Sequence, residues 1–246
     1  YKGLDYPRPE SGGDEFWELF PEEFRLNNEA RRRWQIRFET DSLFRENVRG
    51  YYRLIQGVDD VVGNLTRRLD ELGIGENTII IMMGDNGFFL GEHGLAGKWF
   101  PYEESVRVPL FIYNPQEKEE NKGRRIESIA LNIDIAPTIL EFAGLKKDPN
   151  MQGEPLQNTW KEDDPEWRDR FFYEHRFDHP GLPKSEAVIG SDFKYIHYYE
   201  LPDSSMEFYD LRNDPGEIRN LINSSDYYSQ IKQHEQMLDS LRVTAE

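Results

Sequence analysis

The chain has 246 residues, no cysteine and a formal net charge of −17 at pH 7. The lack of cysteine excludes a disulfide, a thiolate metal site and a cysteine nucleophile within these residues. The acidic charge argues against nucleic acid or an anionic membrane surface as a partner, and no apolar run reaches the ~20 residues of a membrane span. Hydrophobic residues make up 37% and aromatic residues 13%, so we expect a folded chain.

The polar segment 1–47 is rich in Pro, Gly, Trp and charged residues. Its weak periodicity predicts mostly loop, with short helical pieces at Asp14–Phe20 and Ala30–Phe38. From Leu43 the pattern turns helical, and apolar side chains over residues 51–72 recur at three- and four-residue steps, which predicts a long amphipathic helix. We expect Gly73 and Gly75 to end this helix.

Two apolar runs then predict strands. Residues Asn77–Met83 form a continuous, β-branched run of the kind found in a parallel sheet with both faces buried. Residues Val108–Tyr113 form a second such run after a loop. Helical spacing resumes at Ile133–Phe142, with Asn132 or Asp134 as the candidate cap. This alternation of helix and strand is typical of an α/β fold.

The character of the chain changes after Lys146, where Pro, Gly and acidic turns separate short aromatic runs. We expect these runs to form a small antiparallel sheet whose strands are Arg170–Tyr173, Ala187–Ile189, Lys194–Tyr199 and Glu207–Leu211. A closing helix, predicted at Tyr227–Leu241, would pack on that sheet.

The polar residues that follow Met83 occupy the place where α/β sheets collect ligands, beyond the carboxyl end of a strand. Asp85 and Asn86 offer a carboxylate and an amide oxygen, which are hard ligands suited to Ca²⁺ or Mg²⁺. Gly84 and Gly87 permit a sharp backbone turn at this point. The alternative is a plain turn, because Asn-Gly is among the commonest turn dipeptides.

The residues that continue from this turn provide its context. They include Gly91-Glu92-His93-Gly94, then Lys98, then Tyr102-Glu103-Glu104-Ser105-Val106-Arg107-Val108-Pro109-Leu110. Together with the preceding strand and Asp85-Asn86-Gly87, this run closely resembles the sulfatase family of the alkaline-phosphatase superfamily. Later landmarks agree, in particular the run Phe208–Glu217. The resemblance covers roughly residues 44 to 242.

The resemblance implies roles for three residues of this run. Asp85 and Asn86 match the second pair of metal ligands in the family. Lys98 matches the lysine that binds the sulfate group and the leaving oxygen, so it is both a catalytic and a substrate-binding candidate. An ammonium group beside the scissile ester oxygen favours its departure, and a divalent cation neutralises charge that develops on sulfate.

Three further residues are candidates with an alternative structural interpretation. His93 either faces the site as a hydrogen-bond donor or proton shuttle, or ties the loop together with Glu92. His175 and Arg176 lie where a predicted strand runs into a Pro-Gly loop, and such a loop could line a leaving-group pocket. The alternative for these two residues is a solvated loop.

The resemblance also implies a fold and its division. We expect part of an alkaline-phosphatase-like α/β sheet flanked by helices, followed by a small α+β subdomain with an antiparallel sheet. The expected boundaries are 1–145 for the C-terminal part of the catalytic α/β domain and 146–246 for the antiparallel-sheet subdomain.

The implied activity is that of a sulfuric ester hydrolase whose formylglycine nucleophile lies outside this chain. The Cys/Ser-x-Pro-x-Arg motif that yields formylglycine is absent from these residues, and the family's first pair of metal-binding aspartates is not identifiable. We therefore expect the N-terminal half of the same enzyme as a partner and no activity from this chain alone. The expected cofactor is a divalent cation, Ca²⁺ rather than Mg²⁺, and the expected substrate is a sulfated small molecule or carbohydrate.

Two alternatives remain open at this point. One is a phosphonate or phosphate ester hydrolase of the same superfamily, which shares the metal architecture. The other is a non-catalytic, sulfatase-like binding module that kept the fold. By family resemblance we expect an extracytoplasmic location, which would be periplasmic, secreted or lysosomal.

Overall fold

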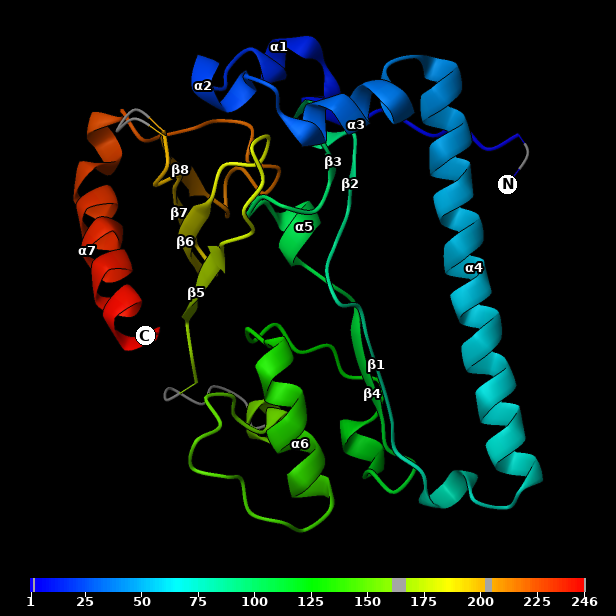
Figure 1. Ribbon diagram of the computed structural model, residues 1–246. Helices are drawn as coiled ribbons and strands as arrows, with labels where there is room; N and C mark the ends of the chain where they lie inside the picture. Colours follow the sequence, from blue (N-terminus) through cyan, green and yellow to red (C-terminus); the bar gives the residue numbers. More distant parts are fainter. Residues whose placement is uncertain (2, 161–166, 202–204, 246) are drawn as a thin grey trace. The chain divides into compact units, whose positions relative to one another are not determined.

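The computed structural model describes residues 1, 3–160, 167–201 and 205–245 (Figure 1). The chain forms two compact units, of which the first combines Tyr1–Pro115 with Phe172–Glu246 and the second is Gln116–Phe171. These units are distinguished by their internal contacts alone. The predicted division into domains 1–145 and 146–246 stays a prediction.

The N-terminal segment folds as a series of short helices, of which two were predicted, whereas the sequence had predicted mostly loop around them. They are η1 (Glu10–Gly12), α1 (Asp14–Trp17), α2 (Glu22–Arg25) and α3 (Glu29–Phe38). Helix α3 begins at Asn28, whose side-chain oxygen accepts hydrogen bonds from the backbone N–H groups of Ala30 and Arg31. This cap satisfies donors that the first turn of a helix leaves free.

The long helix α4 (Asp41–Glu71) confirms the predicted amphipathic helix. It begins with Thr40 as a cap and ends before Gly73, whose φ of +68° favours glycine. Phe44 and Val48 near its start are buried in a core with residues of α3, whereas Leu54 further along is 72% exposed. Neither α4 nor any other helix of the described residues is long and apolar enough to cross a membrane.

After the turn η2 (Gly75–Asn77), the chain forms β1 (Ile80–Met83), which pairs in antiparallel register with β4 (Leu110–Tyr113). Both strands were predicted, but the expected burial of β1 on both faces is wrong for the described residues. All four residues of β1 are only half-buried. Among the described strands only β4 pairs with β1, and an open groove separates this pair from α4.

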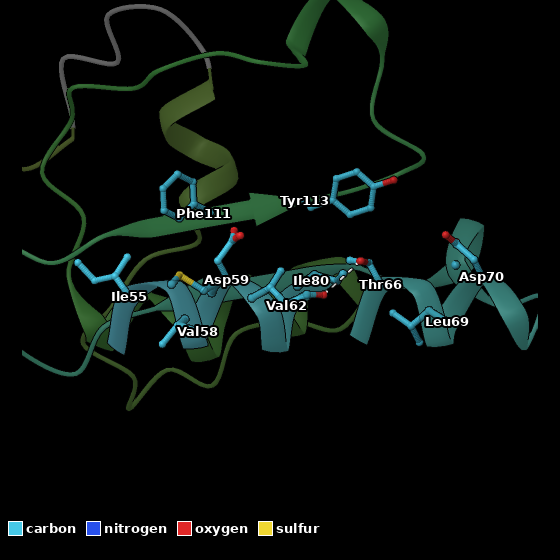
Figure 2. A pocket seen from close by; sticks show the side chains of 12 residues that line it. Ile55, Val58, Asp59, Val62, Thr66, Leu69, Asp70, Ile80, Phe111 and Tyr113 are labelled. Atoms are coloured by element: carbon cyan, nitrogen blue, oxygen red, sulfur yellow. Dashed lines mark hydrogen bonds between the residues drawn. The ribbon is translucent and has the colours of Figure 1, made fainter. Parts of the chain in front are cut away.

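An apolar groove runs between α4 and the β1–β4 pair (Figure 2). Figure 2 shows the rings of Phe111 and Tyr113 on β4 at one side and the side chains of α4 at the other. Its lining is Ile55, Val58, Asp59, Val62, Thr66, Leu69, Asp70, Gly75, Ile80, Met82, Phe111 and Tyr113.

A compact segment connects β1 to β4 along the chain. Its elements are β2 (Phe89–Leu90), η3 (Glu92–Gly94), β3 (Ala96–Gly97) and α5 (Glu103–Val106), with β2 and β3 paired in antiparallel register. Almost every residue from Gly91 to Gly97 is buried. The polar turn after β1 and the segment around Lys98 are therefore built on an ordered base.

The C-terminal sheet confirms the predicted antiparallel strands. Its order is β5-β6-β7-β8, with bounds Arg170–His175, Ser185–Gly190, Phe193–His197 and Met206–Asp210. The turn η7 (Ser225–Tyr227) leads into α7 (Tyr228–Ala245), which packs on β6 and β7 as predicted (Figure 1).

The two faces of this sheet differ because successive side chains of a strand point to opposite sides. Tyr195 and Phe208 lie in the apolar core with Ile231 and Leu238 of α7. On the opposite face, β7 and β8 carry ionisable residues that contact the segment around α5. The sheet therefore connects the closing helix on one side to the base of the polar turn on the other.

The second unit contains α6 (Ile135–Phe142), which was predicted, and the short turns η4 (Glu119–Asn121), η5 (Asn132–Asp134) and η6 (Leu156–Trp160). Asp134 precedes α6 and is completely buried. Its carboxylate accepts the backbone N–H groups of Leu131 and Glu154 at 2.7 and 2.9 Å and forms an ion pair with Arg168. These contacts balance the charge that burial would otherwise leave uncompensated.

Candidate functional site

The polar turn Gly84–Gly87 is tied to the strand pair at one end and to α5 at the other. Gly84 donates its N–H to the carbonyl of Pro109 at 3.1 Å, and Gly87 donates to the carbonyl of Ser105 at 2.8 Å. A Cβ on Gly87 would lie 2.0 Å from the carbonyl oxygen of Glu104. Only glycine therefore fits at this position without moving the turn away from α5.

The two predicted metal ligands lie at the open side of this turn. Asp85 is exposed and Asn86 is half-buried. The Asp85 carboxylate accepts the backbone N–H of Asn86 at 2.9 Å, and the Asn86 side-chain amide donates to the carbonyl of Gly87 at 2.7 Å. The second hydrogen bond orients the amide so that its oxygen faces away from Gly87.

Lys98 meets this amide oxygen although it lies twelve residues further along the chain. Its Nζ donates to Oδ1 of Asn86 at 2.8 Å. The lysine follows β3 and Gly97, whose φ of +114° turns the chain there. The structure thus brings together an exposed carboxylate, an amide oxygen and an exposed ammonium group, which are the residues that the sequence predicted.

The donor set fits a hard divalent cation in part. Asp85 and Asn86 supply oxygen ligands of the type that Ca²⁺ and Mg²⁺ prefer, and Ca²⁺ takes about six to eight of them. Among the described residues no cluster of three or more His, Cys, Asp or Glu side chains forms a complete metal site. Asp85 and Asn86 alone would supply only part of such a site, and their role as metal ligands stays a prediction.

His93 lies in the base of the loop. Its side chain is buried, its ring stacks on Tyr102 with centroids 4.3 Å apart, and its backbone N–H donates to the hydroxyl of Ser11 at 3.1 Å. Its Nε2 is 3.6 Å from a carboxylate oxygen of Glu104, which is too long for a hydrogen bond. These contacts support the structural alternative, and the catalytic role of His93 stays a prediction.

Glu92 contributes to the same loop through a different contact. Its carboxylate accepts the backbone N–H of Leu90 at 2.6 Å. Burial raises the pKa of Glu92, and the neighbouring Glu104 adds to the shift. Glu92 and His93 therefore both stabilise the loop, although they do so through separate partners.

His175 and Arg176 lie at the end of β5 and just beyond it. His175 is half-buried, burial lowers its pKa, and its Nδ1 has no hydrogen-bond partner among the described residues. Arg176 forms an ion pair with Glu174 at 2.7 Å. On the same strand, the hydroxyl of Tyr173 donates to the carbonyl of Trp99 at 3.3 Å, which links β5 to the neighbour of Lys98. The leaving-group role of His175 and Arg176 stays a prediction.

Sequence reasoning missed a buried ionic cluster under α5. Lys194 of β7 is completely buried, and its Nζ lies 2.9 Å from Glu103 and 2.7 Å from Glu217. Beside it, Glu207 of β8 accepts the hydroxyls of Tyr102 and Tyr209 at 2.7 and 3.1 Å. The available signal was a lysine inside an otherwise aromatic and β-branched strand, where a charged side chain needs a buried partner.

Comparisons with known proteins identify the relatives of this chain. Residues 13–145 match the family model described as Sulfatase, and residues 91–244 match the one described as N-sulphoglucosamine sulphohydrolase, C-terminal. A curated relative, the N-acetylglucosamine-6-O-sulfatase of Bacteroides thetaiotaomicron, is 34% identical over 202 residues, which are 80% of this chain and 36% of the relative.

Two solved structures extend the comparison. One is a complex of a protein with its substrate D-glucosamine-2-N,6-O-disulfate, with a TM-score of 0.73 at 32% identity, covering 80% of this chain and 40% of the other. The second is the phosphonate monoester hydrolase of Agrobacterium radiobacter, with a TM-score of 0.69 at 30% identity, covering 79% and 40%. The chain thus spans less than half the length of these relatives.

Proposed function

The chain belongs to the sulfatase family of the alkaline-phosphatase superfamily, and from this premise we propose that it is the C-terminal part of a metal-dependent sulfatase. Its α/β fold with a C-terminal antiparallel sheet is that of its solved relatives. The observation that carries the proposal is the contact between Lys98 and Asn86 at the end of β1, because it joins a cation ligand to a group that binds an anion.

Each residue of this contact has a distinct task in the proposed reaction. Asp85 and Asn86 hold one side of a divalent cation, Ca²⁺ in preference to Mg²⁺, and the bound cation would supply charge neutralisation at the sulfate group. Lys98 binds a sulfate oxygen and stabilises the ester oxygen as it leaves. The formylglycine nucleophile is expected in the N-terminal half of the enzyme, so residues 1–246 alone would be inactive.

The N-terminal half is also the partner that we propose for the apolar groove. The groove between α4 and the β1–β4 pair exposes Phe111, Tyr113 and Ile55, and the relatives extend well beyond the length that this chain matches. A further strand beside β1 and its flanking residues would bury this surface. In that arrangement residues 1–145 complete the catalytic α/β domain and 146–246 form the smaller subdomain.

We propose a sulfated carbohydrate as the substrate class. The support is similarity to an N-acetylglucosamine-6-O-sulfatase and to a complex with a disulfated glucosamine. His175 and Arg176 would then contact the leaving group from the end of β5. An extracytoplasmic location would suit such a substrate, since sulfated carbohydrates of this kind are extracellular or lysosomal materials.

A phosphonate or phosphate ester hydrolase is the second candidate, because the similarity to the Agrobacterium phosphonate monoester hydrolase is nearly as strong. The discriminating experiment measures kcat/KM of the complete protein for an aryl sulfate, an aryl phosphate and an aryl phosphonate ester. We expect the sulfate to be preferred. A preference for the phosphonate would replace the proposed activity, and no turnover of any of the three would favour a non-catalytic, sulfatase-like binding module.

A further inference from the structure

A continuous set of contacts connects the buried face of the C-terminal sheet to the polar turn. Lys194 Nζ donates to the Glu103 carboxylate at 2.9 Å and forms an ion pair of 2.7 Å with Glu217. Glu217 completes the cluster, because its other oxygen accepts the backbone N–H of Glu103 at 2.7 Å. Lys194 therefore contacts the side chain of Glu103 and Glu217 contacts its backbone. Glu103 is the first residue of α5.

Helix α5 passes this constraint to the candidate site. Two residues beyond Glu103, the carbonyl of Ser105 faces the polar turn. The Ser105 carbonyl accepts the Gly87 N–H at 2.8 Å. Because Gly87 has no room for a Cβ against Glu104, the turn touches α5 backbone to backbone. Any displacement of α5 therefore moves Asp85 and Asn86, which precede Gly87 directly.

The cluster has a higher energetic cost than a contact whose only role is to stabilise the fold would need. Lys194 and Glu217 are both completely enclosed, and Glu217 adopts a φ of +52°, which a non-glycine residue seldom adopts. Burial raises the pKa of Glu217, and the charge of Lys194 opposes that shift. Replacing buried ion pairs by apolar residues often costs no stability, so a positional role better accounts for the arrangement.

We propose that Lys194 is a positioning residue for the cation and sulfate site, and that it acts through Glu103, α5 and Gly87 on the orientation of Asp85 and Asn86. This inference rests on the proposed function for its catalytic consequence. Its structural content, which is that Lys194 sets the order of the polar turn, is independent of the reaction.

The activity test uses Lys194→Met in the complete protein, with Lys232→Met on the exposed side of α7 as the matched control. We measure hydrolysis of an aryl sulfate against Ca²⁺ concentration. Loss of a group bonded directly to a metal ligand typically changes metal affinity or activity about 10–100-fold. Lys194 acts less directly, so we expect the half-activating Ca²⁺ concentration to rise by about 10-fold, the lower end of that range. Saturating Ca²⁺ should restore kcat, which loss of folded protein would not allow. An unchanged half-activating concentration in the folded variant would overturn the proposal.

A second variant covers the case in which Lys194→Met fails to fold because it leaves the Glu217 carboxylate buried without a cation. Lys194→Met combined with Glu217→Gln removes both charges and keeps an oxygen for the Glu103 N–H. We expect this protein to fold with the same rise in half-activating Ca²⁺. Wild-type Ca²⁺ dependence in the double variant would contradict a positional role.

Amide hydrogen exchange supplies a readout that needs no turnover. In Lys194→Met, or in the double variant, the segment from Asp85 to Val106 should exchange faster than in Lys232→Met, with the Gly87 amide most affected. The effect should not add to that of Gly87→Ala, since both changes release the same contact. If wild-type protein hydrolyses no sulfate ester but exchange still responds, the proposed function fails and the positional role of Lys194 stands. Unchanged exchange would refute that role.

Discussion

The β1–β4 pair and the C-terminal sheet are built from similar residues, but other elements bury the C-terminal sheet far more than the β1–β4 pair. Five of the six residues of β6 and three of the five of β7 are buried, whereas β1 has no buried residue and Phe111 of β4 is 65% exposed. The C-terminal sheet has α7 on one face and the segment around α5 on the other. Apolar, β-branched composition therefore indicates a strand, but what lies on its faces decides whether the strand is buried.

The candidate site lies on the less covered of these two regions. Asp85 and Lys98 are exposed at the end of β1, and α5 joins this end to the enclosed sheet. We propose that the C-terminal sheet orders the polar turn and that the N-terminal half of the enzyme covers the apolar groove. Five substitutions test this contrast, in order of decreasing expected effect.

The largest effect is expected in the enclosed sheet. Phe208 is completely buried in the core beneath α7, so Phe208→Ala should lower the free energy of unfolding by about 3–5 kcal/mol. Urea denaturation of the complete protein measures this loss. A cost below about 1 kcal/mol would mean that this core is far looser than its burial indicates.

The next effect concerns activity and leaves stability intact. Lys98 is exposed and its removal creates no cavity, so Lys98→Ala should retain the wild-type melting temperature. Its turnover of an aryl sulfate should fall about 10²–10³-fold, as when one group that stabilises a transition state is lost. Asp85→Ala should lower turnover by a similar factor and should also raise the Ca²⁺ concentration needed for half-maximal activity. Wild-type rates in either variant would refute the assigned roles.

A pH effect of similar size is expected from Glu207. Burial raises the pKa of this carboxyl from 4.5 to about 7, although Tyr102 and Tyr209 donate hydrogen bonds that lower it. Between these pH values the folded chain binds the proton that the unfolded chain has lost, so the unfolding free energy falls as pH rises through this window. The loss should be on the order of 3 kcal/mol.

The Glu207→Gln variant isolates this effect, because an amide keeps an oxygen for both hydroxyls and has no charge to bury. Its unfolding free energy should exceed that of wild type increasingly from pH 5 to pH 8. Glu235→Gln, on the exposed side of α7, serves as the control. Parallel pH curves for wild type and Glu207→Gln would show that Glu207 does not titrate in this range.

The smallest effect is expected on the exposed strand pair. Phe111→Ala in the chain of residues 1–246 should change the unfolding free energy by less than about 1 kcal/mol, because the ring is largely exposed. In the complete protein the same substitution should cost more, since the N-terminal half would cover β4. Equal costs in both proteins would mean that this groove has another occupant or none.

Local pattern predicted most of the secondary structure. The three- and four-residue spacing before Gly73 located α4, and the aromatic runs after Lys146 located the four C-terminal strands within about two residues at most ends. It could not predict how far β1 is buried, because burial depends on what packs on the faces of a strand. The local pattern also missed the burial of Lys194. A charged residue in a strand is predicted to be exposed unless its partners are known, and its partners Glu103 and Glu217 are distant in the chain.

For the site, the order of residues from Asp85 to Leu110 was enough to indicate the family, and it predicts the ligand types and the role of Lys98. Short-range spacing carries that information because chemistry constrains residue types at a turn. Folding alone placed the Lys98 ammonium against the Asn86 amide, put His93 inside the loop, and set α5 between Gly87 and the Lys194 cluster. Those outcomes required long-range contacts, in which burial converts charges and hydrogen bonds into fixed positions.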